Sequence, residues 1–563
     1  MNAIAGDVTA LAREKHPAAQ ATIRRWEELK SSNQRPEHEE SWDEIARLIR
    51  PQRGGHSLSD PSGRRHEKPL SSEPIMAASS FAAGLYAGLT NPANRWGGLE
   101  TPDEDLNKWK PMAEWNDIAT RRVIASFTPA LSSFYPATFQ GYADIAAFGN
   151  MFGYDELDQG KRRFIDVTLS LAEVVWEVDA WGRVWGWIRK FRLVPGQALK
   201  LFKDRGPLPD KIREAAETNA TEKFTFYQHV LINEDWQPGR IGPRGKAYVS
   251  RYVCEEGECL ISERGYDDMP GYVARWDVDS GHTIGTGPGF IALASARVNH
   301  EMEASALRAR QFASDPTLLA PGREDWQLNG HVRPGYVVYG GLNMRGDQML
   351  RPLQTGAWSG LTDQDKLAKV EEIKNAFHYA LMTVQGRTGM TSEETLIMEE
   401  ARMRNWAPHS DRIMEEYAAR KFERRFRLLW KAGQIPPPPA EAQGLPLQVR
   451  YQSAAAMAMK AREGLAVRQF LADLAPLAQA KPRVMDRLDE DALVEVLHEA
   501  SPSLPAKLLR GRDEADKIAA ERAQQAQMAQ AMAMAREGAG ALKDVAGAAA
   551  AVQPQGMAEG APQ

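Results

Sequence analysis

Three side chains in the stretch WDVDSGH are of the types that bind divalent metal ions. They are Asp277, Asp279 and His282. A calcium-binding loop, however, needs an oxygen ligand at the position of Gly281 and a glutamate further along the chain. The spacing therefore favours an ordinary surface turn, and a metal site stays as the alternative.

A glycine-rich stretch, GTGPGF at 285–290, precedes a predicted helix and could hold a phosphate at the helix N-terminus. It lacks the GxGxxG order, and Pro288, a residue typical of the first helical turn, lies inside it. We prefer to interpret it as a hinge between two parts of the chain. The lysines that follow glycine at 160–162 and 245–247 are not followed by serine or threonine, so neither stretch is a phosphate loop. HExxH and GxSxG motifs are also absent, so we expect no enzyme and no cofactor.

The two cysteines, Cys254 and Cys259, flank the turn sequence EEGE. The pattern predicts a β-hairpin with the two thiols close across it. A disulfide is geometrically possible, but a reducing cytosol argues against it, and a zinc site needs more soft ligands than lie nearby. We expect structural thiols, and the sequence leaves their redox state open.

Aromatic and basic clusters allow two interpretations each. Four tryptophans on predicted strands could form a stacking platform, although burial in a sheet is the commoner explanation: Trp176, Trp181, Trp185 and Trp187. The basic run ARKFERRFRLLWK at 419–431 could contact phosphates. Its aromatic residues recur every four positions, which predicts an amphipathic helix with an apolar stripe of Phe422, Phe426 and Trp430. We expect its arginines to form the solvated or intersubunit face, with direct DNA binding as the alternative.

The composition bounds the class of protein. The chain has 563 residues, of which 43% are hydrophobic and 26% charged, and its mean hydropathy is -0.48. These values fit a soluble protein with real hydrophobic cores. The formal net charge of -5 argues against a protein that binds nucleic acid with its whole surface. We find neither a transmembrane run nor a signal peptide, so we expect no membrane association and a product that is cytoplasmic when made.

The elements that must position these residues begin with an α+β body before about residue 280. Two long helices follow, the first opened by Pro288 and the second capped by Thr362 and Asp365, with strands and loops between them. Their apolar residues follow the helical period, at Ile291, Ala294, Val298, Met302, Ser305, Ala309 and Phe312, and at Leu367, Val370, Ile373, Phe377, Leu381 and Val384. Such helices cannot bury both faces within one subunit. We therefore expect them to pack on copies of themselves, and a heterologous contact that closes makes a ring.

A short loop, a third helix and a C-terminal region complete the order. The third helix begins near Thr391, reaches Trp430 and must kink or break before Pro408. The proline run at 436–439 predicts a stiff linker, and 453–511 a compact helical unit. The Ala-, Gln- and Met-rich tail after Ala520 is either a helix that needs partners or disordered.

This order of elements resembles the head-to-tail connector, or portal, proteins of short-tailed bacteriophages over most of the chain. Four stretches carry the resemblance: FAAGLYAGLTNPANRWGGLE (81–100), FQGYADIAAFGNMFGYDE (139–156), LMTVQGRTGMTSEET (381–395) and the Met/Gln/Ala-rich tail. None of them is a catalytic signature. The signal lies in their order and joint presence.

The resemblance implies an elongated α+β subunit made of named parts. They are a wing (1–286, continued at 393–432), two stem helices (287–312 and 359–384), a β-containing clip (313–358), a tunnel loop (385–392), a Pro-rich linker (433–449), a helical crown (450–512) and a tail (513–563). It further implies a ring of identical subunits, usually twelve, at one capsid vertex of the virion. Double-stranded DNA would pass through this ring without sequence specificity during packaging and ejection. The implied partners are the terminase large subunit, tail or adaptor proteins, and the major capsid and scaffolding proteins, with assembly in the host cytoplasm.

The tunnel loop is the part that this family would expose to DNA. Its residues are Gln385, Gly386, Arg387, Thr388, Gly389, Met390, Thr391 and Ser392. The glycines would let the loop move, and a ring of Arg387 would touch phosphates without reading bases. Lys366, Lys369 and Lys374 are further candidates for basic rings in the channel, with solvated stem surface as the alternative.

Two other classes of protein remain as alternatives. One is a metal-dependent DNA-processing enzyme, such as a nuclease, with Asp277, Asp279 and His282 as ligands. The other is a monomeric scaffolding or adaptor protein. The sequence does not determine the ring stoichiometry, the host, or the residues that meet terminase, adaptor or capsid.

Overall fold

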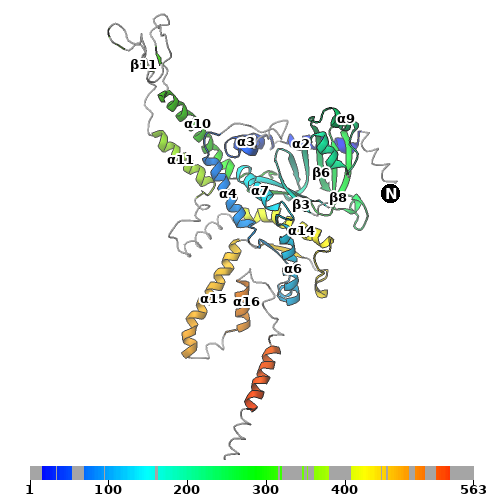
Figure 1. Ribbon diagram of the computed structural model, residues 1–563, viewed down its shortest axis with the longest axis vertical. Helices are drawn as coiled ribbons and strands as arrows, with labels where there is room; N and C mark the ends of the chain where they lie inside the picture. Colours follow the sequence, from blue (N-terminus) through cyan, green and yellow to red (C-terminus); the bar gives the residue numbers. More distant parts are fainter. Residues whose placement is uncertain are drawn as a thin grey trace, which may run out of the picture. The chain divides into compact units, whose positions relative to one another are not determined.

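The chain folds as an α+β protein, as predicted, in a computed structural model (Figure 1). The residues that the structure describes are 15–32, 35–53, 69–93, 95–158, 163–203, 205–279, 281–314, 318–319, 345, 347, 351–352, 361–379, 408–444, 447–451, 454–480, 488–500, 515 and 517–532.

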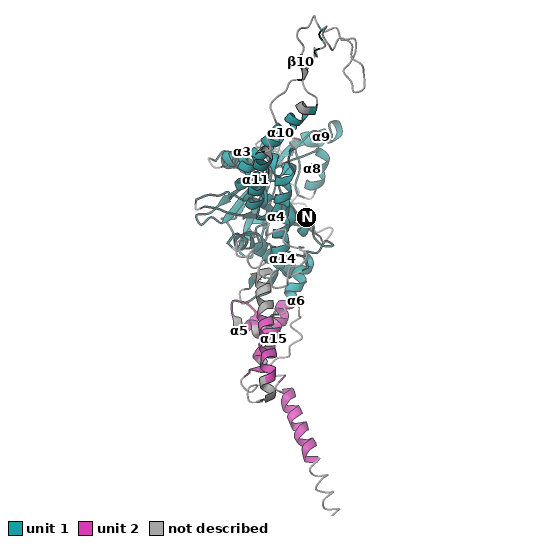
Figure 2. Cartoon of the chain, turned by 90° about the vertical axis from the view of Figure 1, so that its left-hand side faces the viewer, with its two compact units in different colours: residues 1–100, 118–437, 447–458 teal, residues 101–117, 438–446, 459–563 magenta. Residues whose placement is uncertain are grey.

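Two compact units divide the chain, and both are discontinuous in sequence (Figure 2). The first comprises 1–100, 118–437 and 447–458, and the second 101–117, 438–446 and 459–563. The predicted stem helices belong to the same unit as most of the predicted wing. Most of the predicted crown belongs to the second unit, which also takes 101–117 from the predicted wing.

A five-stranded antiparallel sheet forms part of the first unit. Its strands follow one another in chain order: β4 (Val174–Val178), β5 (Val184–Leu193), β6 (Phe224–Ile232), β7 (Tyr248–Cys254) and β8 (Cys259–Tyr266). Helices α8 (Pro195–Phe202) and α9 (Asp210–Thr218) bury one face of the sheet. Helix α2 (Pro17–Lys30) covers the other face through Ala19 and Trp26. The period-2 alternation of these strands gives the sheet two apolar faces and therefore two helical layers.

A second sheet has three antiparallel strands, in the order β3-β2-β9. Their bounds are β2 (Asn150–Asp158), β3 (Arg163–Leu169) and β9 (Gly271–Arg275). It packs on α7 (Phe134–Phe148) and on a long helix at 408–431. That helix contains a π-helical segment, η4 (Met414–Ala419), followed by α14 (Arg420–Lys431).

Two long helices, α10 (Pro288–Ser314) and α11 (Leu361–Ala376), lie side by side (Figure 1). Pro288 begins α10, as predicted. The second stem helix was expected over 359–384, but α11 ends at Ala376, and His378 adopts a positive φ of 50°. A positive φ interrupts a right-handed helix, which is the physical reason for the earlier end. In the segment predicted as clip, β10 (Leu318–Leu319) pairs with β11 (Arg351–Pro352).

The remaining elements are shorter or stand apart from the two sheets. In the first unit, α3 (Arg35–Leu48) and α4 (Glu73–Leu89) pack near α7 and α10, and β1 (Gly97–Glu100) pairs with β12 (Gln448–Tyr451). The others are η1 (Pro51–Arg53), α5 (Glu104–Lys108), α6 (Lys110–Ser126), η2 (Pro243–Gly245), η3 (Glu256–Glu258), η5 (Ala440–Ala442), α15 (Ala454–Ala480), α16 (Glu490–Glu499) and a helix at 517–532. Among the described helices, none is both long and apolar enough to span a bilayer.

The structure resolves two of the sequence interpretations for the sheet. The hairpin around Cys254 and Cys259 is confirmed, because β7 and β8 pair directly and both thiols are free and buried. The tryptophans differ from the expected common burial. Trp176 and Trp187 are buried, whereas Trp185 is partly exposed and Trp181, at the β4–β5 turn, is 86% exposed. A turn has no covering layer, so the strand alternation does not extend to Trp181.

Candidate functional site

The paired helices α10 and α11 run antiparallel. Ser295 on α10 donates to Glu372 on α11 at 2.6 Å, and Glu303 on α10 forms an ion pair with Lys366 on α11. Residue numbers rise along one helix as they fall along the other. Three small residues of α10, Ala292, Ala296 and Ala306, are buried. The two predicted helices therefore form one rod within the subunit.

The apolar stripe predicted on α10 is not buried by this rod. Ile291 is 73% exposed and Val298 is 41% exposed, although both belong to the predicted stripe. On α11 the predicted stripe divides, because Leu367 is 68% exposed while Val370, Ile373 and Phe377 are buried. One chain thus leaves large aliphatic side chains of the rod uncovered. These exposed side chains are available for contact with another protein.

The three candidate lysines on α11 each face a carboxylate. Lys366 pairs with Glu303, Lys369 with Glu372 at 2.8 Å, and Lys374 with Glu73 of α4 at 3.5 Å. The Lys374 ammonium also lies 5.6 Å from the centre of the Tyr379 ring. These pairs neutralise much of the local positive charge along the rod. The tunnel-loop residues, Gln385 to Ser392, lie outside the described residues.

The glycine-rich stretch at 285–290 forms a tightly packed joint at the base of α10. The side chain of Asn150 at the start of β2 accepts from Gly285 N at 2.8 Å and donates to Gly285 O at 2.6 Å. A methyl group on Gly287 would lie 2.7 Å from Gly149 Cα, and one on Gly289 would lie 2.0 Å from Ala147 O. Glycine is needed here because the backbone of the stretch touches the backbone at the end of α7. This backbone contact leaves no phosphate-sized space at the glycines. The stretch connects the body to α10 as a packed joint, and the hinge motion expected from the sequence stays a prediction.

The metal-like residues lie in a turn next to that joint. Asp277 N and O bond to Thr286 O and N, and His282 N donates to Asp279 O at 3.1 Å. These contacts use backbone atoms, so they shape a turn. Across the part of the chain that the structure describes, no three His, Cys, Asp or Glu side chains are grouped to hold a metal ion.

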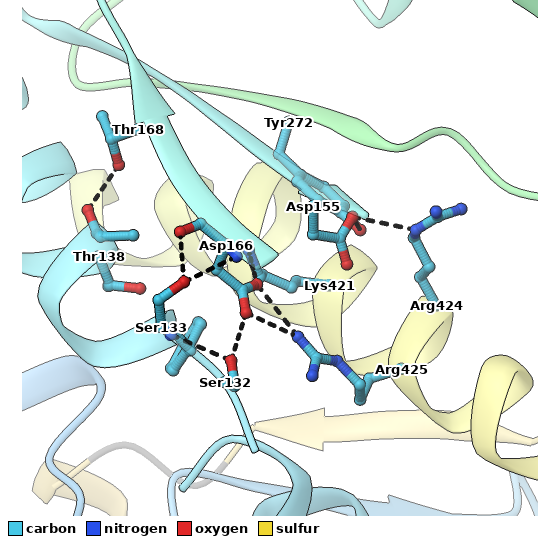
Figure 3. A network of polar contacts seen from close by, with 12 residues as sticks. Ser132, Ser133, Thr138, Asp155, Asp166, Thr168, Tyr272, Lys421, Arg424 and Arg425 are labelled. Atoms are coloured by element: carbon cyan, nitrogen blue, oxygen red, sulfur yellow. Dashed lines mark hydrogen bonds and ion pairs between the residues drawn. The ribbon is translucent and has the colours of Figure 1, made fainter. Parts of the chain in front are cut away.

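Two buried aspartates face each other in the second sheet. Asp155 on β2 and Asp166 on β3 are direct cross-strand partners, and both are almost fully buried. Like charges at this spacing repel, so the pair needs cations nearby. The long helix at 408–431 supplies them (Figure 3).

The Asp166 carboxylate binds two cationic side chains and accepts a hydrogen bond from a hydroxyl group. The Lys421 ammonium lies 2.7 Å from Asp166 Oδ1, Arg425 donates to both carboxylate oxygens at 3.0 and 3.1 Å, and Ser132 donates to Oδ2. Burial alone would raise the pKa of Asp166, but the charges of Lys421 and Arg425 outweigh burial and lower that pKa to about 2. Asp166 is therefore ionised in the folded chain at neutral pH.

The second aspartate has its own cation. Arg424 Nε lies 3.0 Å from Asp155 Oδ1, and Tyr272 donates to the same oxygen at 3.1 Å (Figure 3). Aromatic rings surround the cations, with the Arg425 guanidinium 3.6 Å from the Phe164 ring centre. Lys421 lies 5.3 to 5.4 Å from the rings of Phe134, Tyr272 and Tyr417. We call Asp155, Asp166, Lys421, Arg424 and Arg425 the buried charge cluster.

The buried charge cluster corrects the sequence interpretation of the basic run. Its arginines were expected on a solvated or intersubunit face. Arg427 is exposed, but Arg424 and Arg425 are buried, as is Lys421. Phe422 is buried as expected, whereas Trp430 is partly exposed. The partners are more than 250 residues away in sequence, so helical periodicity alone could not identify them. The sequence feature that could have indicated the cluster is an aspartate at a core-facing position of both β2 and β3.

The same helix is attached at its π-helical segment. Arg275 on β9 donates from its backbone to Glu416 Oε2 at 2.9 Å and pairs with that carboxylate through its guanidinium. Tyr417 and Thr138 share a hydrogen bond of 2.7 Å between η4 and α7. A π-helical segment adds a residue to a helical turn and changes which side chains face the core. Here it places Glu416 and Tyr417 toward the sheet.

Comparisons with known proteins give a consistent family. The family model for bacteriophage head to tail connecting protein matches residues 19–509. The portal protein of Salmonella phage epsilon15 is 26% identical over 530 residues, covering 91% of this chain and 92% of its own. The probable portal protein of Bordetella phage BPP-1 is 26% identical over 531 residues, covering 92% and 93%.

Solved structures are similar at a lower level. A chain in the virion of a native gene transfer agent particle has a TM-score of 0.32 and 12% identity, covering 76% of this chain and 90% of its own. A chain in the neck of an empty gene transfer agent particle has a TM-score of 0.32 and 10% identity, covering 70% and 86%.

Proposed function

Because the chain belongs to the bacteriophage head to tail connecting protein family, we propose that it forms the portal of a phage particle. Copies of the chain assemble into a closed ring at one vertex of the capsid. Double-stranded DNA is packaged through the ring by the terminase and later ejected through it, and the tail attaches to it. In this proposal the protein is a structural conduit without catalytic activity of its own.

The exposed apolar stripe of α10 and α11 carries the proposal. Ile291, Val298 and Leu367 project from the rod and are exposed in a single chain. A second copy of the rod offers a matching apolar surface, and a heterologous contact repeated around an axis closes into a ring. The rods of neighbouring subunits would then line a central channel.

The attachments of the rod support a channel of fixed geometry. The glycine joint packs the base of α10 against α7 and β2, Arg297 pairs with Glu44 of α3, and Lys374 pairs with Glu73 of α4. The buried charge cluster fixes the helix at 408–431 on the three-stranded sheet, and Asn150, which contacts the joint, is the first residue of β2 in that sheet. The backbone contacts of the joint and two partly exposed ion pairs hold the rod on the body.

The lysines of the rod suit a channel that does not retain DNA. Each of Lys366, Lys369 and Lys374 has an acidic neighbour, so a ring of them would attract phosphates weakly. We propose that Arg387, in the predicted tunnel loop, makes the stronger contact with DNA phosphates. Phosphate contacts of this kind are independent of base sequence.

Substitutions in the stripe test assembly. The double variant Ile291→Asp, Val298→Asp places two charges on a surface that the proposal buries between subunits. We expect folded chains of 62.6 kDa in place of rings, as measured by light scattering with unchanged circular dichroism. The matched control is Ile241→Asp, because Ile241 is fully exposed on the β6–β7 connection, and its rings should persist. Rings that form equally well in the double variant would contradict the proposal.

Substitution of the loop arginine tests the DNA contact separately. We expect Arg387→Ala to assemble normally but to change the amount of DNA packaged or retained per particle, because one phosphate contact is lost from every subunit. Packaged genome length, measured on purified particles, is the readout. Loss of rings in this variant would instead give Arg387 a structural role.

A further inference from the structure

The two cysteines of the chain lie at the two sides of one hairpin turn. Cys254 is the last residue of β7, Cys259 is the first of β8, and their Cα atoms are cross-strand partners. Directly opposed residues of antiparallel strands have Cα atoms about 4.5 or 5.5 Å apart. Both values lie within the range of about 4.4 to 6.8 Å that disulfides adopt. The pairing therefore brings the two cysteines within reach of a disulfide.

Both thiols point to one face of the sheet. They lie in the core cluster beneath α8 and α9, together with Phe226 and Ile261. The Cys254 thiol forms a hydrogen bond with Cys259, and this bond is the main cause that lowers the pKa of Cys259 and raises that of Cys254. A thiol with a lowered pKa is the better nucleophile of a pair. The cross-strand pairing therefore places the two sulfurs where they can react with each other.

The two sulfurs are buried, so an oxidant reaches them only when the hairpin end opens. β8 is an edge strand of the sheet, and the connecting turn includes two residues with positive φ, Gly257 at 76° and Glu258 at 47°. Contacts to α2 hold the turn, with His16 N donating to Glu258 O at 3.0 Å and Gln20 donating to the Glu258 carboxylate at 2.6 Å. Glu255 in the same turn also bonds to Tyr227 and Lys190. These are few contacts, so opening of the turn requires less free energy than unfolding of the sheet.

We propose that Cys254 and Cys259 form a dithiol that oxidants of the peroxide class convert into a cross-strand disulfide. The Cys259 thiolate attacks a peroxide oxygen, the O–O bond breaks, and a sulfenic acid forms with release of one water. The Cys254 sulfur then attacks the Cys259 sulfur, the S–S bond forms, and a second water leaves. Two electrons pass from the sulfurs to the peroxide, and the two thiol protons are taken up in the two waters.

The disulfide would fix the hairpin that contacts the N-terminal end of α2. A chain made in a reducing cytosol carries the thiols, and a particle released into an oxidising medium acquires the disulfide. This setting rests on the proposed function, whereas the reaction of the two cysteines does not. The disulfide would restrict opening of the turn that contacts His16 and Gln20.

Thiol counting on the purified full-length chain tests the proposal. The chain is treated with hydrogen peroxide, denatured in the presence of iodoacetamide, digested and analysed by mass spectrometry, with and without later reduction by dithiothreitol. We expect alkylation of Cys254 and Cys259 to fall together, a crosslinked peptide that contains both, and full recovery after reduction. In Cys259→Ser the remaining Cys254 should stay alkylatable at the same peroxide concentration.

Three outcomes would overturn the proposal. They are a disulfide between two copies of the chain, independent oxidation of one cysteine to a sulfinic acid, and two thiols that persist even in mild urea, where the turn opens. The assay gives the same answer for single subunits and for rings. Its failure is therefore distinguishable from a failure of the chain to assemble.

Discussion

At the scale of single residues, we expect the interactions of Asp155 and Asp166 to be the most sensitive to substitution. Two carboxylates opposite each other in a buried sheet are stable only while cations accompany them. Lys421, Arg424 and Arg425 meet this need from one helix, within little more than one turn. The cluster thereby couples two segments that are far apart in sequence, and removal of one partner leaves the others uncompensated.

The first prediction concerns Asp166→Asn. The substitution keeps the shape of the side chain but leaves Lys421 and Arg425 buried without their anion. We expect a loss of about 3–5 kcal/mol in the free energy of unfolding, measured by urea denaturation. The matched control is Glu263→Gln, which breaks the partly exposed pair with Arg251 and should cost less than about 1 kcal/mol. Equal losses in the two variants would show that burial of the cluster contributes nothing.

The pH dependence of stability gives a second prediction. The folded pKa of Asp166, about 2, is depressed below its ordinary value of 3.8. Its contribution is therefore complete above pH 3.8 and is lost as the pH falls toward 2, an effect of about 2 kcal/mol. Urea midpoints across this window should fall more steeply for the wild-type chain than for Asp166→Asn. Parallel pH profiles would assign the acid sensitivity to other groups.

At the scale of elements, the glycine joint decides how α10 leaves the body. Gly287 lies against Gly149 and against the carbonyl of Ile145, so the start of the helix has no freedom to move relative to α7. Gly149 itself ends α7 with a positive φ of 70°. The joint is a packing constraint between two backbones, and side-chain flexibility cannot relieve it.

Gly287→Ala tests that constraint. The added methyl group would lie within 3 Å of backbone atoms on α7. We expect a loss of about 1–3 kcal/mol in the free energy of unfolding, because the backbone must shift to accept it. Gly196→Ala in α8 is the control, since no atom lies within 4 Å of the new methyl group and alanine suits a helix. A tolerated Gly287→Ala would mean that the joint can open.

The elements were largely predictable where periodicity determines them. Pro288 marked the start of α10, and the alternation after Gly153 marked the strands. The end of α11 was not predictable, because the apolar period continues through Leu381 while the backbone turns at His378. The buried charge cluster was also missed, because an arginine on a predicted helix is expected to be exposed to solvent unless its carboxylate partner is known. The second miss comes from tertiary contacts that a local pattern does not encode.

At the scale of the whole molecule, the α10–α11 rod is incomplete in one chain. Ala292, Ala296 and Ala306 are buried, whereas Ile291, Val298 and Leu367 remain exposed. The sequence periodicity led to this expectation, because both faces of each helix could not be buried in one subunit. Covering these side chains with a neighbouring copy explains their presence on an otherwise charged surface.

Native mass by multi-angle light scattering, with negative-stain imaging of the same peak, tests the portal assignment most directly. The account predicts a mass that is a multiple of 62.6 kDa and a closed ring with a central hole wide enough for duplex DNA. A stable species of 62.6 kDa at high concentration and across a range of salt would contradict it, because a single chain has no channel.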